Sequence, residues 1–138
     1  TAESCTGGGI AEAVTAVAGS SAWFEAGFVT YSNRSKEALL AVPSATLECF
    51  GAVSEETVRA MAAGALALVA ADWAIAVSGI AGPAGGLPDK PVGTVWINWT
   101  GRSGFTRSQR YCFGGDRQAI RQQSVAAALR GLLDVIRG

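Results

Sequence analysis

The sequence contains no histidine, two lysines and no Cys-x-x-Cys pair. Without histidine, the chain cannot use Ser-His-Asp or Cys-His catalysis, and nearly all common zinc sites are excluded. Its three cysteines (Cys5, Cys49 and Cys112) are an odd number without paired spacing. We therefore expect free thiols and no metal site, in a reducing compartment that is by default the cytoplasm.

Neither charge nor hydropathy indicates a nucleic-acid or membrane partner. Eleven basic residues balance eleven acidic ones, so no overall field attracts nucleic acid or an anionic membrane. The apolar stretch from 60 to 88 is interrupted by Asp72 and then by glycines and a proline, which favours helix, turn and buried strand over a membrane crossing. Late arginines could serve a local phosphate or form a solvated face: Arg102, Arg107, Arg110, Arg117 and Arg121.

Three common catalytic and nucleotide-binding motifs are also missing. The chain has no G-x-x-x-x-G-K-[ST], no G-x-G-x-x-G between a strand and a helix, and no G-x-S-x-G. These absences argue against a P-loop enzyme, a Rossmann dehydrogenase and a nucleophile elbow.

The order of predicted elements favours one compact α/β domain, a three-layer α/β/α sandwich with a mixed central sheet. Apolar spacing and capping residues predict helices over 8–18 and 32–42, from Ser54 to about 69, and after Asp116. Strands are predicted over 23–31, 73–78, 92–100 and 105–113, with the second of these at the sheet centre and the last two as an antiparallel hairpin. That central strand is 73–78.

For two sets of apolar residues, the sequence indicates where the side chains can lie. The last helix is expected to face the core through Ile120, Val125, Leu129, Leu132, Leu133 and Ile136. The aromatics Trp23, Phe24 and Trp99 suit either the core or a homodimer interface.

The opening stretch TAESCTGGGIAEA places Ser4, Cys5 and Thr6 before three glycines and a helix. Glycines allow a tight turn and close approach to a ligand, and the first amides of a helix lack intrahelical partners. Such a turn can bind an anion or stabilise an oxyanion. The alternative is that Ser4 or Thr6 only caps the helix.

Both lysines, Lys36 and Lys90, lie near element boundaries beside loops. Lys36 falls in the first turn of a predicted helix, where the macrodipole and Arg34 would disfavour its charge and prepare it as a base. The alternative is an ordinary exposed helix lysine. Lys90 lies near the end of a stretch rich in glycine and proline, residues 79–91, which is long enough to suggest a functional loop.

Six blocks in order carry a family resemblance: AESCTGG (2–8), GSSAWFEAGFVTYSNRSK (19–36), GAVSEETV (51–58), SGIAGPAGG (78–86), KPVGTVW (90–96) and GDR (115–117). Together they resemble the CinA C-terminal domain family, which includes nicotinamide-nucleotide amidases. The resemblance covers the whole chain and implies a single domain, 1–138. It also implies that a helix and most of a first strand, present in other members, would precede Thr1.

The resemblance implies hydrolysis of the carboxamide of nicotinamide mononucleotide, giving nicotinate mononucleotide and ammonia without metal or coenzyme. By matching position, Ser4 would be the nucleophile, Lys36 its base, and Tyr31 a residue that orients or relays the proton. Ser78 would help to hold the reacting group, and Arg117 matches a functional arginine.

Substrate binding is expected at two glycine-rich segments. Backbone amides of Thr6, Gly7 and Gly8 would stabilise the oxyanion. The candidates for the phosphate, which the sequence does not rank, are Gly79, Gly82, Gly85, Gly86, Lys90 and Arg117. The resemblance also implies a homodimer. The alternative function is a catalytically silent nucleotide-binding or regulatory module.

Overall fold

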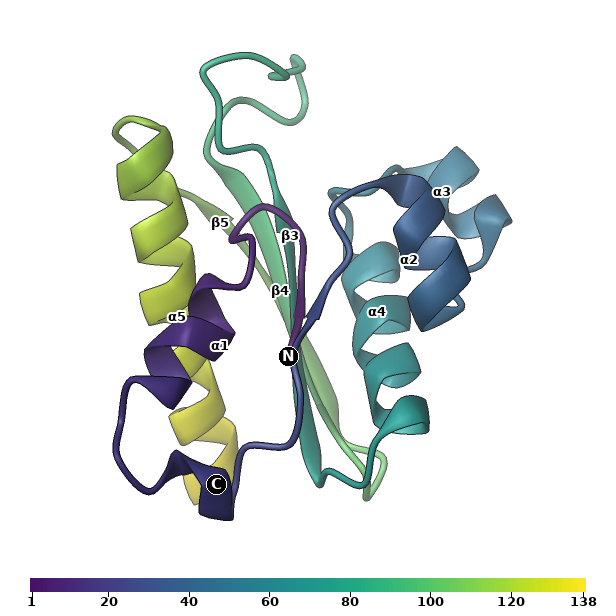
Figure 1. Cartoon of the computed structure of the whole chain (residues 1–138). Helices are drawn as coiled ribbons and strands as arrows, with labels where there is room; N and C mark the ends of the chain where they lie inside the picture. The colour runs from purple at the N-terminus through teal and green to yellow at the C-terminus, as the bar shows by residue number, and fades with distance from the viewer.

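The computed structural model describes residues 1–138 and is a three-layer α/β/α sandwich, as predicted. Helices α1 and α5 cover one face of a five-stranded sheet, and α2, α3 and α4 cover the other (Figure 1). The elements are β1 (Ala2–Glu3), α1 (Gly9–Thr15), a 3-10 turn η1 (Ser20–Ala22), β2 (Phe28–Val29), α2 (Asn33–Leu40), α3 (Ser44–Phe50), α4 (Glu55–Leu68), β3 (Trp73–Gly79), β4 (Thr94–Gly101), β5 (Thr106–Cys112) and α5 (Arg117–Arg137).

The sheet is mixed, with strand order β2-β1-β3-β4-β5. Strands β2, β1 and β3 are parallel, whereas β3, β4 and β5 alternate in direction. This arrangement confirms the predicted central position of residues 73–78 and the predicted hairpin. The carboxyl ends of the three parallel strands therefore meet at one edge of the sheet.

Side-chain caps fix the starts of three helices where the sequence predicted them. Ser32 Oγ accepts a hydrogen bond from Ser35 N at α2, and Ser54 Oγ accepts one from Thr57 N at α4. At α5, the carboxylate of Asp116 accepts from Ala119 N. Each cap satisfies one amide that the helix itself leaves unpaired.

The strand predicted over 23–31 was too long, and one helix was missed. Only Phe28 and Val29 form β2, which pairs with the two-residue β1 and lies at the edge of the sheet. The preceding aromatic residues have no neighbouring strand with which to pair. The missed helix, α3, begins directly after Pro43. This proline is the N-cap residue and has an extended conformation (ψ 135°).

Trp99 belongs to the core and not to an exposed interface. Its side chain is 0% exposed, and its indole Nε1 donates to Ala128 O at 2.8 Å. Gly131 allows this close approach, because a Cβ atom there would collide with the indole ring. Of the two placements that the sequence left open for Trp99, the core is therefore correct, whereas Trp23 is exposed.

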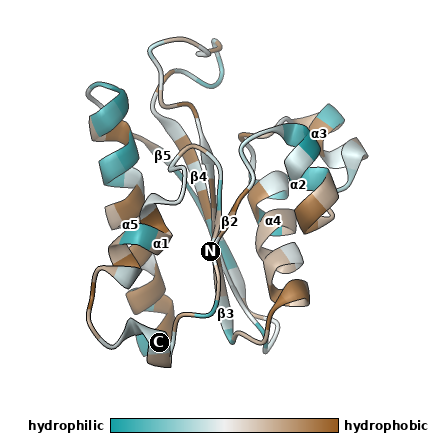
Figure 2. Cartoon of the chain, viewed as in Figure 1, coloured by the Kyte–Doolittle hydropathy of each residue, from teal (hydrophilic) through white to brown (hydrophobic).

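The predicted core-facing stripe of α5 is confirmed in part, because Ile120 is buried and Val125, Leu129 and Leu132 are partly buried against the core. The buried residues of α5 are Ile120, Ser124, Ala128 and Gly131, whereas Leu133 and Ile136 are exposed. Small residues are buried here because the indole of Trp99 occupies the space against the helix. Figure 2 shows hydrophobic residues gathered in the C-terminal half of α5, which borders an open groove.

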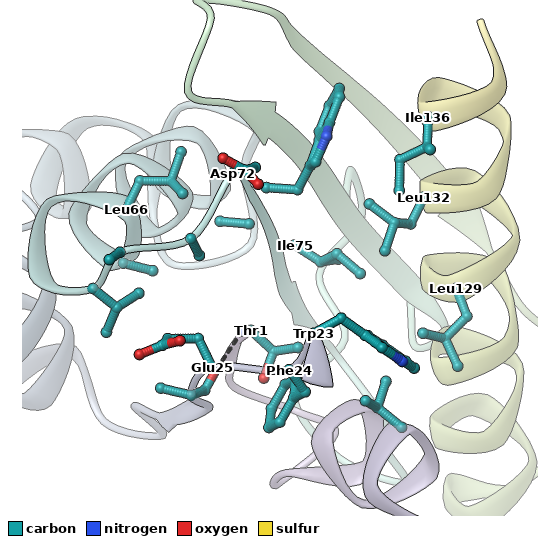
Figure 3. Close-up of a pocket in the computed structure, with 18 of the residues that line it drawn as sticks. Thr1, Trp23, Phe24, Glu25, Leu66, Asp72, Ile75, Leu129, Leu132 and Ile136 are labelled. Carbon is teal, nitrogen blue, oxygen red and sulfur yellow. Dashed lines mark hydrogen bonds between the residues drawn. The ribbon is translucent and has the colours of Figure 1, made fainter. Parts of the chain in front are cut away.

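That groove has a volume of about 740 Å³ and is mainly apolar. Trp23 and Phe24 line it together with Leu129, Leu132 and Ile136 of α5, and Ile75 lies between the two sides (Figure 3). The groove lies at the start of β3. On the β1 side, β3 pairs only through Ala76 and Val77, so Trp73–Ile75 have no β1 partner. None of the helices has the length and hydrophobicity that a membrane crossing requires.

Candidate active site

Ser4 lies directly after β1, at the edge where the parallel strands end. Its amide donates to Val77 O at 3.0 Å, which places it beside Ser78 near the end of β3. The chain leaves β1 through α1 on one face and reaches β3 through α2, α3 and α4 on the other (Figure 1). Ligands of open α/β sheets bind at such a change of direction, outside the carboxyl ends of the strands.

Lys36 reaches this edge from α2, which lies on the face of the sheet opposite to α1 (Figure 1). It shares the buried face of α2 with Leu40, one turn later, and is only 1% exposed. Its Nζ donates to Ser4 Oγ at 3.0 Å, to Thr30 O at 2.8 Å and to Tyr31 O at 3.0 Å. The alternative of an ordinary exposed helix lysine was therefore wrong.

Burial lowers the pKa of Lys36 from 10.5 to about 8, because a buried ammonium loses its hydration. This direction was predicted from the sequence with the helix dipole and Arg34 as its cause, but desolvation is the dominant cause. The pKa therefore lies close to neutrality, where a lysine can exchange a proton during a reaction.

The three acceptors around Nζ also orient the amine. An ammonium has three N–H donors, and here one is directed to each acceptor. When the amine is neutral, two N–H groups can remain on the carbonyls of Thr30 and Tyr31, which leaves the lone pair facing Ser4 Oγ. This is the orientation that a base needs to accept the serine proton.

Three amides of the turn after Ser4 are free, that of Cys5 among them. Gly7 N donates to Ser4 O and Gly9 N to Thr6 O, whereas the amides of Thr6 and Gly8 donate to no acceptor in the chain. Two of the three amides expected to bind an oxyanion are thus available, and that of Gly7 is already engaged.

Helix α1 is capped by Glu3, a residue that the sequence analysis missed. Its carboxylate is 0% exposed and accepts from the amides of Ile10 and Ala11, at 2.8 and 2.9 Å, and from Thr6 Oγ1 at 2.6 Å. The N-cap residue, Gly8, has no side chain to do this. The alternative that Ser4 or Thr6 only caps the helix was therefore wrong, and Ser4 is free for other chemistry.

Cys5, which adjoins Ser4, is a poor nucleophile. Burial raises the pKa of its thiol from 9.0 to about 11. The thiolate is the reactive form of cysteine, so this thiol is unreactive at neutral pH. All three cysteines are unpaired, as predicted.

Tyr31 contributes different groups to two places. The carbonyl oxygen of Tyr31 accepts from Lys36 Nζ and lies 3.4 Å from Ser4 Oγ. Its phenol is instead bonded to Arg117, whose Nη2 is 3.1 Å from Tyr31 Oη, while Nη1 donates to Gly82 O at 2.8 Å. Arg117 thus joins the start of α5 to the glycine-rich loop and to the residue that holds Lys36.

Other predicted binding residues are spread along the loop between β3 and β4, which projects from the sheet (Figure 1). Ser78 and Gly79 end β3, near Ser4, whereas Gly85 and Gly86 are exposed farther along the loop. Lys90 Nζ donates to Phe50 O, at the end of α3. Lys90 is therefore engaged in holding the loop to α3.

The late arginines have separate partners and do not share one site. Arg102 and Arg110 donate to backbone carbonyls, and Arg107 stacks over the ring of Trp99 at 4.9 Å. Arg121 donates to the carbonyls of Cys5 and Thr6. No sequence signal pointed to this contact, because 115 residues separate Arg121 from Thr6. No group of three or more metal-ligating side chains is present.

The model of the CinA C-terminal domain matches residues 1–136. This chain belongs to the CinA C-terminal domain family. A protein named nicotinamide-nucleotide amidohydrolase PncC from Pseudomonas putida is 60% identical over 135 residues, which cover 98% of this chain and 84% of that protein. The protein of the same name from Escherichia coli K12 is 54% identical over 132 residues, covering 96% and 80%.

Solved structures from the CinA family have the same fold. The competence/damage inducible protein CihA from Agrobacterium tumefaciens is 48% identical with a TM-score of 0.95, covering 96% of this chain and 81% of that one. The competence damage-inducible protein A from Klebsiella pneumoniae is 46% identical with a TM-score of 0.95, covering 99% and 84%.

Proposed function

We propose that this chain is an amidohydrolase that converts nicotinamide mononucleotide to nicotinate mononucleotide and ammonia, with Ser4 as nucleophile and Lys36 as general base. Relatives at 54–60% identity carry the name of this activity. The contact that supports the mechanism best is the 3.0 Å hydrogen bond between Lys36 Nζ and Ser4 Oγ. It supplies a nucleophile and a base without histidine.

In the acylation step, Ser4 Oγ attacks the carboxamide carbon while the neutral amine of Lys36 accepts the hydroxyl proton. The carbonyl oxygen becomes an oxyanion, which the free amides of Thr6 and Gly8 are available to stabilise. When the C–N bond breaks, Lys36 returns the proton to the leaving nitrogen, which departs as ammonia. A nicotinoyl ester on Ser4 remains.

Deacylation follows the same steps with water as the nucleophile. Lys36 takes a proton from water as it attacks the ester carbon, and gives it back to Ser4 Oγ as the ester bond breaks. The products are nicotinate mononucleotide and the free serine. No metal or coenzyme enters either step.

The nucleotide phosphate needs a separate cation or amide site. Arg117 is the strongest of the sequence candidates, because it lies between Tyr31 and Gly82 and retains N–H donors that make no bond in the structure. Lys90 is a weaker one, because its ammonium is bonded to Phe50 O. Ser78 is our candidate to hold the group that reacts at Ser4, because Ser4 N donates to the carbonyl of the neighbouring Val77.

The decisive experiment measures ammonia release from nicotinamide mononucleotide by the chain and by Ser4→Ala. We expect turnover by the chain and none by the variant, with little change in the unfolding midpoint. Substantial activity in Ser4→Ala would remove Ser4 as the nucleophile. Nucleotide-induced thermal stabilisation without ammonia release from the chain would instead indicate the silent binding module.

The remaining expectations from the sequence stay predictions. They are a cytoplasmic location, a homodimer and a single domain over 1–138. If the gene encodes residues before Thr1, we expect the helix and strand that the resemblance implies to occupy the apolar groove beside Trp73–Ile75. Extending the chain by those residues would then raise its unfolding midpoint.

A further inference from the structure

Arg121 connects α5 to the turn that follows Ser4. Its Nε donates to Cys5 O and its Nη2 to Thr6 O, both at 3.1 Å. The guanidinium is half-buried and makes no other hydrogen bond. A cation that binds two successive carbonyls of a turn restricts the rotation of both peptide planes.

The orientation of these carbonyls determines where the neighbouring amide points. The carbonyl of Cys5 and the N–H of Thr6 belong to one planar trans peptide, so they point in opposite directions. Because the carbonyl is directed to Arg121 on α5, the Thr6 N–H is directed away from α5. Helix α2, which carries Lys36, covers the opposite face of the sheet (Figure 1).

The Thr6 amide is also free. It has no acceptor in the chain, whereas the next amide, Gly7 N, donates to Ser4 O. A hydrogen bond from a cation to the carbonyl polarises the peptide and makes its N–H a stronger donor. The contact therefore affects both the direction and the strength of one possible oxyanion donor.

We infer that Arg121 is a positioning residue that directs the Thr6 N–H toward the oxyanion formed on the carbon attacked by Ser4. The inference rests on the proposed amidase function and adds to it a residue that need not touch the substrate. Because the oxyanion exists only after attack, loss of Arg121 is expected to reduce kcat far more than it raises KM.

Arg102 provides a matched control at the other end of the sheet. It also holds backbone carbonyls, donating to Leu66 O, Val69 O and Ala71 O at 2.7–2.8 Å. These carbonyls lie in the last turn of α4 and just after it, at the start of β3 and far from Ser4. A merely structural role would give Arg121→Met and Arg102→Met the same kinetic phenotype.

The test measures kcat, KM and the unfolding midpoint for the chain, Arg121→Met and Arg102→Met with nicotinamide mononucleotide. Removal of one oxyanion donor costs about 10²- to 10³-fold in kcat, so we expect a loss of about 10- to 100-fold in Arg121→Met with KM within about threefold. Arg102→Met is expected to keep kcat within about twofold, even if its unfolding midpoint falls.

The outcomes separate this inference from the proposed function. An active chain whose Arg121→Met variant retains kcat, or changes only KM, overturns the inference alone. A chain that releases no ammonia overturns the proposed function and the inference with it. If Arg121→Met does not fold, Arg121→Gln keeps a donor for one carbonyl and is judged in the same way, with an expected loss of about tenfold in kcat.

Discussion

Lys36 Nζ lies 3.0 Å from Ser4 Oγ, although 32 residues separate them in the sequence. The contact exists because Ser4 follows β1 and α2 follows the neighbouring parallel strand β2, so both residues lie at the carboxyl ends of these strands. Thr30 and Tyr31, between them, contribute the two carbonyls that hold the amine. The serine, the lysine and the lysine's acceptors therefore come from two adjoining segments of the fold.

The lowered pKa of Lys36, about 8, predicts the pH dependence of activity. Only the neutral amine can accept the serine proton, so kcat/KM should rise about tenfold per pH unit below 8 and level off above it. The measurement is initial ammonia release between pH 6 and about 10. Lys36→Ala should lose about 10²- to 10⁴-fold and the pH-dependent rise with it. A profile that is flat across pH 8 in the chain would contradict the base assignment.

The same pKa predicts how stability changes with pH. Below pH 8, Lys36 is protonated in both the folded and the unfolded chain, so it adds no pH dependence. Between pH 8 and 10.5 the unfolded chain binds more protons, and the free energy of unfolding should rise with pH. Cys5 acts in the opposite sense, because its raised pKa removes stability between pH 9 and about 11.

The contribution of Lys36 is therefore seen most cleanly between pH 8 and 9. Urea unfolding at these two pH values should show a rise for the chain and for Lys90→Met, which removes the only other lysine. Lys36→Met should show a smaller rise, left by the Thr1 amino group, because burial lowers the pKa of that group from 8.0. An equal rise in both variants would mean that another group causes it.

Cys5 should be dispensable for turnover. Its thiol is buried and protonated at neutral pH, since its pKa is about 11. We expect Cys5→Ala to keep kcat/KM within about threefold, because only a thiolate attacks efficiently. In the unmodified chain, iodoacetamide should label the exposed Cys49 and Cys112 first, which peptide mass spectrometry can follow. Loss of turnover in Cys5→Ala, with the fold intact, would instead implicate the thiol.

Glu3 should be important for stability because it receives several hydrogen bonds in a buried position. In Glu3→Gln, the amide nitrogen that replaces one oxygen can no longer accept from its N–H or O–H donors. We expect the free energy of unfolding to fall by about 1–3 kcal/mol. Glu12→Gln, an exposed substitution on α1, the helix that Glu3 caps, is the control and should change the free energy of unfolding by less than about 0.5 kcal/mol. Equal effects would show that burial of the carboxylate is unimportant.

Most of the fold could be predicted from the sequence because helix caps and apolar runs are patterns of neighbouring residues. Ser32, Ser54 and Asp116 begin helices through their own side chains, and residues 73–78 carry the apolar run of a central strand. The errors arose where distant residues decide the outcome. The partner of β2 is only two residues long, and Trp99 determines which side of α5 can be buried.

The site, too, was predicted only where local sequence patterns identify a residue, and was missed where contacts between distant residues decide its role. Matching blocks identified Ser4 and Lys36, and the structure brings these two together. Glu3 was missed because a carboxylate in a strand gives no sign that it will cap a helix seven residues later. The cause of the lysine pKa shift was also missed, since desolvation depends on packing that a sequence pattern does not reveal.

The phenol of Tyr31 should affect substrate binding more than the chemical step. It is 61% exposed and bonded to Arg117, whereas only the backbone carbonyl of Tyr31 contacts Lys36. Tyr31→Phe keeps that carbonyl and removes one partner of the guanidinium. We therefore expect KM for nicotinamide mononucleotide to rise several-fold and kcat to change by less than about threefold.

Arg117→Met provides the matched measurement for this contact. If the two side chains act together, the double variant should raise KM little more than Arg117→Met alone, because removing either partner already breaks the bond. A loss of about 10²-fold or more in kcat for Tyr31→Phe would contradict this expectation, since general acid–base groups contribute on that scale. Such a loss would assign the phenol to proton transfer, the role that the family resemblance implies.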